Sequence, residues 1–151
     1  MRTRSFVAVI AMGLALAACG GGGQSTADAQ KEISANWTSF FNGANSDTTA
    51  KAKLLQDAST LQAAIAAAAA NPTEKAVSAN VKSVELLKGN SCTSIGLTSP
   101  CAKVTYDIVS NGNTLLPGAT GNAVRQKGKW VVSKGTFCSL LSLAGPKPQG
   151  C

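Results

Sequence analysis

The stretch that decides the fold class is AAIAAAAANPTEKAVSANVKSVELL, residues 63–87, because the periodicity of the chain changes inside it. Its first part is a run of alanines, which have the highest intrinsic helix propensity. Pro72 ends that helix, since the residue before a proline disfavours the helical backbone conformation. Beyond Pro72, residues 76–86 follow a period of two, as a β-strand does. The stretch therefore predicts helices before Pro72 and a sheet after it.

Upstream of this stretch the sequence predicts two more helices. The first covers residues 26–42, with Thr26 as its N-cap and Asn42-Gly43 at its end. Its apolar side chains recur at the three- and four-residue spacing of one helix face, and they are Ile33, Trp37, Phe40 and Phe41. Residues 46–57 form a short second helix, and the helix that contains the alanine run begins at Ser59.

Downstream, the sequence predicts four strands and a last helix. The first strand has one face made of Val77, Ala79, Val81, Ser83 and Glu85. The other strands cover residues 102–110, 120–126 and 129–133, with turns at residues 111–112 and 127–128. A short helix over residues 136–143 ends before Gly145-Pro146. Helices followed by consecutive antiparallel strands give an α+β fold.

The N-terminus has the features of an export signal. Arg2 and Arg4 precede an apolar run over residues 6–18, which is too short to span a bilayer and is typical of a signal peptide. Residues 16–19, LAAC, resemble the lipobox of bacterial lipoproteins. We therefore predict removal of residues 1–18 and attachment of diacylglycerol and a fatty acid such as palmitate to Cys19. The two chains of the diacylglycerol are enough for stable anchoring.

The predicted mature protein has three parts. Residues 19–27 form the lipidated cysteine and a glycine-rich tether, residues 28–145 a single α+β domain, and residues 146–151 a tail. The membrane, reached through the lipid on Cys19, is the expected partner. We expect the protein on the outer face of the cell membrane, with a fraction released to the cell surface or medium. Export excludes nucleic acid as a partner.

The whole chain has a formal net charge of +7, from 14 Lys and Arg against 7 Asp and Glu. Loss of the two N-terminal arginines lowers that charge to +5. Four basic residues lie near the predicted second hairpin, and they are Arg125, Lys127, Lys129 and Lys134. One interpretation is a patch that binds anionic headgroups or phosphorylated polymers. The other is solubility and protection of a sheet edge.

Apart from Cys19, the chain has four cysteines, an even number that predicts two disulfides in an exported protein. They allow three connectivities. We predict the pairs Cys92–Cys101, closing the loop TSIGLTSP between two strands, and Cys138–Cys151, tying the tail to the last helix. Their spacing does not fit a zinc site, and the chain has no histidine, so no metal and no cofactor are expected.

The absence of histidine also excludes Ser-His-Asp and Cys-His sites. The nearest approach to a catalytic site is Tyr106 beside Asp107. Neighbouring residues on a strand point to opposite faces, so only one of them can enter the interior. Tyr106 shares its face with Val104 and Ile108 and is expected in the core, whereas Asp107 is expected in solvent. The sequence therefore predicts a protein that is not an enzyme.

Two segments carry a family resemblance. KAKLLQDAS, residues 51–59, and above all VRQKGKWVVSKGTFCSLLSLAG, residues 124–145, resemble the small mycobacterial secreted antigens and lipoproteins typified by the low-molecular-weight antigen. This resemblance implies a fold similar to nuclear transport factor 2 and cystatin, in which helices pack on a curved antiparallel sheet to form a cone. It implies no catalytic residues, and the disulfide prediction does not rest on it.

The expected function is that of a non-enzymatic cell-envelope module that binds an apolar ligand, a lipid or an envelope protein. In a helix-on-sheet cone, five aromatic residues would face one another across an interior pocket: Trp37, Phe40, Phe41, Tyr106 and Trp130. The competing interpretation is that they fill the core. Two alternatives to binding are a cone-fold enzyme of the isomerase or dehydratase type and a surface antigen module with no small ligand.

Overall fold

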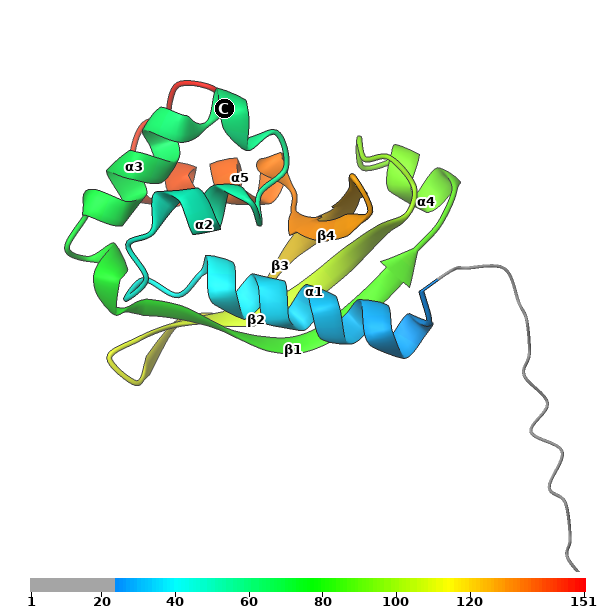
Figure 1. The fold of residues 1–151 in the computed structure, drawn as a ribbon. Helices are drawn as coiled ribbons and strands as arrows, with labels where there is room; N and C mark the ends of the chain where they lie inside the picture. The colour runs from blue at the N-terminus through cyan, green and yellow to red at the C-terminus, as the bar shows by residue number, and fades with distance from the viewer. Residues whose placement is uncertain (1–23) are drawn as a thin grey trace, which may run out of the picture.

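The computed structural model describes residues 24–151 (Figure 1). The predicted signal peptide, the lipobox, Cys19 and most of the tether lie outside these residues. The described part is an α+β fold, as predicted, with a four-stranded antiparallel sheet in the order β1-β2-β3-β4. The assignment to the nuclear transport factor 2 or cystatin class stays a prediction.

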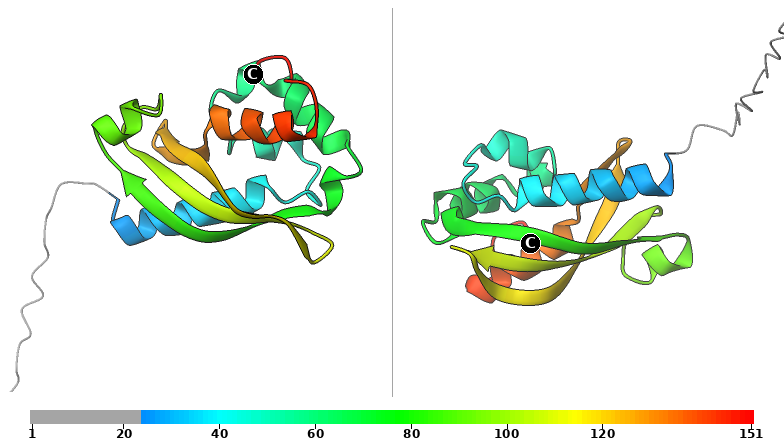
Figure 2. Two further views of the ribbon diagram at one scale, coloured as in Figure 1. Left: turned by 180° about the vertical axis from the view of Figure 1, so that it is seen from behind. Right: turned by 90° about the horizontal axis from the view of Figure 1, so that it is seen from below.

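The helical elements of this part are α1 (Thr26–Phe40), α2 (Thr48–Ala52), η1 (Ala58–Thr60), α3 (Gln62–Ala70), η2 (Glu74–Ala76), α4 (Asn90–Thr93) and α5 (Lys134–Ala144). The strands are β1 (Val77–Leu87), β2 (Cys101–Ser110), β3 (Asn113–Gln126) and β4 (Lys129–Val132). Helix α1 runs along the sheet, while α2, α3 and α5 gather over one end of it (Figure 1). The views in Figure 2 show the sheet curling beneath these helices, with the β2–β3 hairpin projecting at one end.

Helix α1 begins at Thr26, as predicted, but its N-cap lies one residue earlier than predicted and its end comes before Asn42. Ser25, not Thr26, is the N-cap, because its side chain accepts a hydrogen bond from the backbone N–H of Asp28 at 3.1 Å. The helix ends at Phe40. Its buried face consists of Ala29, Ile33, Trp37 and Phe40, which confirms the predicted helical periodicity.

Strand β1 contains a bulge that reverses its alternation. The register with β2 shifts between Val81 and Ser83, so Lys82 has no direct partner. Ser83 and Glu85 are exposed, so the predicted face that they would share with Val77, Ala79 and Val81 does not continue beyond the bulge. The residues that turn towards the helices are Val77, Ala79 and Val81 before the bulge and Val84 and Leu86 after it.

Strand β3 is longer than predicted, starting at Asn113 instead of Thr120. Pro117 and Gly118 argue against a strand, but β4 pairs only with residues 123–126, so the first half of β3 is an edge where proline is tolerated. A register shift lies here as well, between Tyr106 and Ile108 of β2. The hairpin is therefore a long two-stranded projection.

The second predicted helix is interrupted. Helix α2 ends at Ala52, and the following segment joins the edge strand instead: Gln56 donates its N–H to the Val132 carbonyl at 2.9 Å, and Val132 donates to the Leu54 carbonyl at 2.8 Å. Leu55, on the resulting bridge, is buried. The segment between α2 and α3 thus forms hydrogen bonds with the backbone groups of Val132 on the free edge of β4. Local periodicity does not predict this pairing, because the two segments lie far apart in the sequence.

Candidate functional site

An apolar cavity of about 290 Å³ lies at the end of the molecule where the helices gather. It is lined by residues from the end of α1, from α2, α3, η2 and α5, and from the β1–β3 part of the sheet. At about 30 Å³ for each non-hydrogen atom, the volume that a water molecule takes in the liquid, it holds roughly ten such atoms. It is partly open, and Leu115 and Leu143 on its lining are 60% and 73% exposed.

The cavity exists because small residues face large ones across it. Phe40, Phe41 and Phe137 contribute rings, whereas α3 contributes Ile65 and two small residues, Ala68 and Ala69. Gly43 also lies on the lining, and a methyl group there would overlap the Glu74 carbonyl. The alanine run that the sequence marked as a plain helix is therefore one wall of the cavity.

The structure separates the five aromatic residues predicted to form a pocket. Phe40 and Phe41 line the cavity, but Trp37, Tyr106 and Trp130 do not and are buried in the core, at 1%, 1% and 3% exposure. The Trp37 and Tyr106 rings meet edge to face with centroids 5.1 Å apart, and Phe41 stacks on Tyr106 at 5.7 Å. The middle of the predicted chamber is thus filled by its own aromatics, and the cavity lies beyond them.

The leucines of the cavity were not part of the predicted site. Leu115 and Leu116 come from the half of β3 that the sequence did not predict as strand. Leu140, Leu141 and Leu143 come from α5, whose leucine-rich sequence was interpreted only as a helix. The one available signal was the presence of these five leucines in the sequence.

Two charged side chains lie on the cavity wall, Lys51 and Glu74. The ammonium of Lys51 donates to the carbonyls of Phe40 at 2.6 Å and Asn42 at 2.9 Å, and lies 5.8 Å from the centre of the Phe40 ring. It thereby places a positive charge at the C-terminal end of α1, whose last turn has no basic residue of its own. Burial lowers the pKa of Lys51, and the negative charge of Glu74 opposes this shift.

Trp130 has a structural role in the edge strand. Its backbone N–H donates to Glu32 at 3.0 Å, its carbonyl accepts from Asn36 at 2.8 Å, and its indole N–H donates to Gln24 at 3.0 Å. Gln24 in turn donates to Glu32 at 2.7 Å. Side chains of α1 thus cover this part of the edge of β4.

Tyr106 and Asp107 lie on opposite faces of β2, as predicted. Burial raises the pKa of Tyr106 to about 12. Asp107 accepts a hydrogen bond from the N–H of Gly118 at 2.9 Å and pairs with Lys82 at 2.9 Å, which together hold the pKa of its carboxyl below the usual value. Its side chain is only 15% exposed, so it is not the solvated residue that was expected. Its carboxylate instead provides a hydrogen-bond acceptor for the backbone N–H of Gly118, next to the register shift between β2 and β3.

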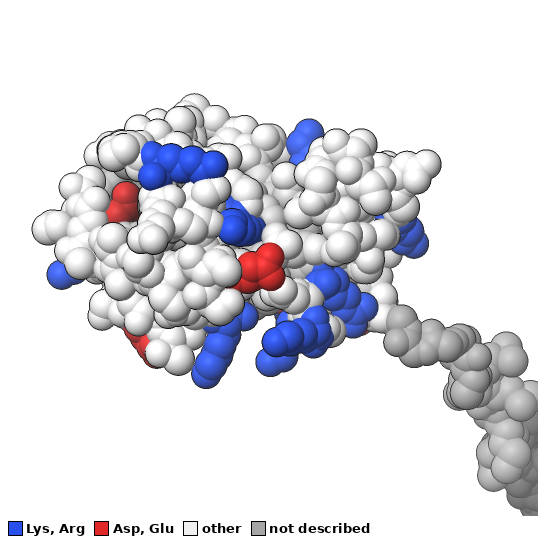
Figure 3. Space-filling view, turned by 90° about the horizontal axis from the view of Figure 1, so that it is seen from above, with Lys and Arg blue, Asp and Glu red and all other residues white. Residues whose placement is uncertain are grey.

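Three of the four basic residues lie at the tip of the β3–β4 hairpin, and the fourth, Lys134, begins the next helix. Arg125 and Lys129 lie on the paired ends of β3 and β4, where Arg125 donates to the Gly128 carbonyl at 3.3 Å, and Lys127 occupies the turn. Lys134 begins α5. The face seen in Figure 3 carries basic side chains in several places, with acidic groups near some of them. Both interpretations of these four residues, an anion-binding patch and a soluble, protected sheet edge, stay predictions.

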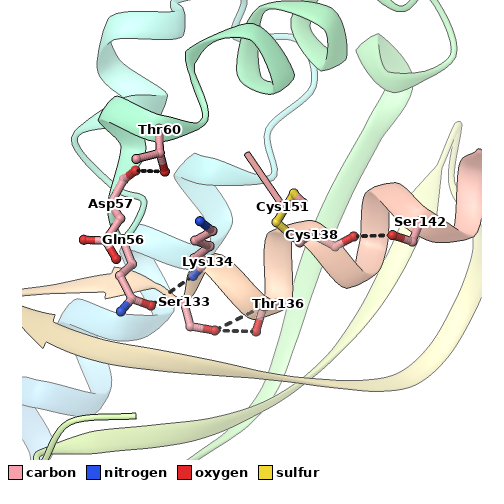
Figure 4. The surroundings of a disulfide bond; sticks show 9 residues. All are labelled: Gln56, Asp57, Thr60, Ser133, Lys134, Thr136, Cys138, Ser142 and Cys151. Carbon is pink, nitrogen blue, oxygen red and sulfur yellow. Dashed lines mark hydrogen bonds between the residues drawn. A yellow bond between two sulfur atoms is a disulfide. The ribbon is translucent and has the colours of Figure 1, made fainter. Parts of the chain in front are cut away.

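The structure confirms both predicted disulfides, Cys92–Cys101 with Cα atoms 5.8 Å apart and Cys138–Cys151 with Cα atoms 5.5 Å apart. The second joins α5 to the tail (Figure 4). A methyl group on Gly150 would overlap the Thr60 carbonyl, so the tail lies against the end of η1. Each crosslink closes a short loop, which contributes about 3 kcal/mol in the chain-entropy model.

Buried polar groups hold the start of α5 in place. The Ser133 hydroxyl accepts from the N–H of Thr136 at 3.2 Å, and the Thr136 hydroxyl accepts from the N–H of Asn122 at 2.7 Å. The N–H of Lys134 donates to Gln56 at 3.1 Å (Figure 4). Ser133 is therefore the N-cap of α5, and the Thr136 hydroxyl joins the helix start to β3. These hydrogen bonds give both hydroxyls a structural role.

Residues 26–148 match the family described as low molecular weight antigen MTB12, C-terminal domain. The match covers most of the chain, so the chain belongs to this family. No curated protein and no solved structure matches it. Membership of this antigen family fits a surface or secreted module and an extracytoplasmic location. Between residues 24 and 151, no helix is long and apolar enough to cross a membrane.

Proposed function

We propose that this member of the MTB12 antigen family is an extracytoplasmic binding module that takes a small apolar group or part of an acyl chain into the cavity at the end of α1. The observation that carries the proposal is the cavity itself, about 290 Å³ and lined almost entirely by apolar side chains. Buried apolar pockets with a few polar groups are the usual form of small-molecule sites. Leu115 and Leu143 at 60% and 73% exposure supply an apolar edge for an entering chain.

The proposal includes the lipid anchor on Cys19, supported by the sequence around it. Helix α1 is about 22 Å long at 1.5 Å per residue. Its first residue, Thr26, falls within the last two residues of the predicted tether, which are helical, whereas Phe40 at its other end lines the cavity. An anchor joined to the beginning of α1 therefore leaves the cavity at the far end of this helix. Replacing Cys19 by Ala should abolish fatty-acid labelling and leave an uncleaved precursor, and normal labelling and processing of that variant would contradict the anchor.

The competing enzymatic interpretation has one observation in its favour, the burial-lowered pKa of Lys51 at the cavity. A nucleophilic lysine needs its neutral amine. Here two backbone carbonyls accept hydrogen bonds from the ammonium, and accepting groups favour the charged form. We therefore favour binding without turnover.

The test uses the exported, oxidised and delipidated protein with 1-decanol, which matches the cavity volume. A ligand that binds only the folded state raises the melting temperature with its concentration. We expect a saturable rise in the wild type. In Ala69→Phe, where a ring fills the cavity, we expect none.

The matched control is Ala66→Phe, on the same helix but exposed and away from the cavity, which should respond like the wild type. A wild type that does not respond would overturn the proposal. So would equal responses of the two phenylalanine variants, since the alcohol would then bind elsewhere.

A further inference from the structure

The charged groups of the cavity wall give information on the head group of the ligand. Apart from Lys51 and Glu74, the lining side chains are apolar except for the hydroxyl of Thr73. These three residues come from α2, η2 and the turn before η2. The polar groups therefore belong to the helical side of the cavity, whereas the sheet contributes only Val77, Ile108 and two leucines.

The hydrogen bonds that Lys51 makes within residues 24–151 use two of its three N–H donors. An ammonium carries three N–H donors. Two are directed to the carbonyls of Phe40 and Asn42, and within residues 24–151 no acceptor is assigned to the third. The side chain is half-buried, so a ligand atom placed there would be partly shielded from water.

Glu74 offers hydrogen-bond acceptors, whereas Lys51 offers a donor. Its charge acts on Lys51, yet the two side chains do not form an ion pair in the described part of the chain. In the same part of the chain, no donor is bonded to its carboxylate oxygens, and an ionised carboxylate only accepts hydrogen bonds. A residue with an ammonium donor and a residue with a carboxylate acceptor thus both line the apolar cavity.

We infer that the cavity selects a single-chain amphiphile with an uncharged hydroxyl head over one with a carboxylate or an amine. This inference rests on the proposed binding function. A hydroxyl both accepts and donates, so it can accept from Lys51 and donate to Glu74. A carboxylate would gain at Lys51 but be repelled by Glu74, and an amine the reverse. Each charged head would also lose more hydration than a hydroxyl.

The experiment compares three ligands of equal chain length, 1-decanol, decanoate and decylamine, by calorimetric titration at pH 7 below their aggregation concentrations. We expect the alcohol to bind most tightly to the wild type. Glu74→Gln removes the repulsion, so the affinity for decanoate relative to 1-decanol should rise at least about fivefold, as expected for one charge acting through solvent at a few ångströms.

The matched control is Glu85→Gln, the same change of charge on the exposed face of β1, which should leave the ratio unchanged. Failure of all three ligands to bind the wild type would overturn the binding function itself. Binding of 1-decanol with no preference over decanoate, or a ratio that Glu74→Gln does not alter, would overturn the head-group inference and leave the binding function intact.

Discussion

One helix packs in two different ways along its length. Around Trp37, helix α1 meets Tyr106 with ring centroids 5.1 Å apart, and neither ring lines the cavity. At Phe40 and Phe41, less than two turns further on, the same helix borders a cavity of about 290 Å³. The helix contributes large aromatics in both places. What differs is the facing element, which shows that packing density depends on what a face meets rather than on that face alone.

In the filled region, size is complementary. Gly121 of β3 faces Trp37, and a methyl group at Gly121 would lie 3.0 Å from the indole ring. A large side chain therefore occupies the space left by a small one. In the hollow region Ala68 and Ala69 leave similar space, but no side chain of the described residues fills it.

The largest effect should come from emptying the filled region. Trp37→Ala removes a side chain that is 1% exposed, and truncating such an aromatic costs about 3–5 kcal/mol of unfolding free energy. Denaturant unfolding measures this loss. Leu143→Ala, at 73% exposure on the cavity lining, should change stability by less than about 0.5 kcal/mol. Equal losses in the two variants would contradict the contrast between the regions.

The disulfides should differ in what they protect. Replacing either pair by alanines should lower stability by about 3 kcal/mol. Cys138–Cys151 holds α5, which supplies four of the cavity residues, whereas neither Cys92 nor Cys101 lines the cavity. We therefore expect the double variant Cys138→Ala/Cys151→Ala to show a weaker thermal response to 1-decanol than the wild type. The double variant Cys92→Ala/Cys101→Ala should keep the wild-type response. The reverse result would mean that Cys92–Cys101, and not Cys138–Cys151, maintains the shape of the cavity.

Adding carbon atoms should have opposite consequences in the two regions. Gly121→Ala introduces a methyl group against Trp37 and Thr136, and overpacking of this kind costs about 1–3 kcal/mol. Ala69→Leu adds more volume, but on the cavity wall, so stability should stay the same or rise. Thermal unfolding of the two variants compares them directly. A destabilised Ala69→Leu with a neutral Gly121→Ala would reverse the assignment of filled and hollow.

The sequence predicted the parts of this contrast that depend on local pattern. The amphipathic face of α1 and the alternation of β2 turn Trp37 and Tyr106 inward, although Trp37 was predicted to line a pocket and instead packs in the core. Both disulfides followed from the cysteine count and the short loops they close. These features require knowledge only of neighbouring residues along the chain.

The position of the cavity could not be predicted, because it depends on contacts distant in sequence. Local pattern does not show that the β1 bulge at Lys82 changes the inward face, or that β3 extends back to Asn113 and brings Leu115 to the lining. It also gives no sign that α3 presents alanines to the phenylalanines of α1 and α5. Aromatic content indicates a core, whereas a hollow arises where small residues of one element face large residues of another.

The smallest change tests how well water is excluded from the filled region. Tyr106 is the single tyrosine of the chain, so the absorbance of its phenolate reports one site. Burial raises its pKa to about 12, whereas an unfolded chain loses the proton near pH 10. The native state thus holds the proton longer, and this contribution to stability is complete below about pH 10 and is lost as the pH rises towards 12.

A titration at 295 nm, with circular dichroism at each pH to show that the chain is folded, should give a midpoint well above 10. Trp37→Ala opens the space beside the Tyr106 ring, and the midpoint should fall towards 10 in that variant, whereas Leu143→Ala should leave it unchanged. Ionisation near pH 10 in the folded wild type would mean that water reaches the phenol. The aromatic middle would then be as open as the cavity, and the distinction between the two regions of α1 would fail.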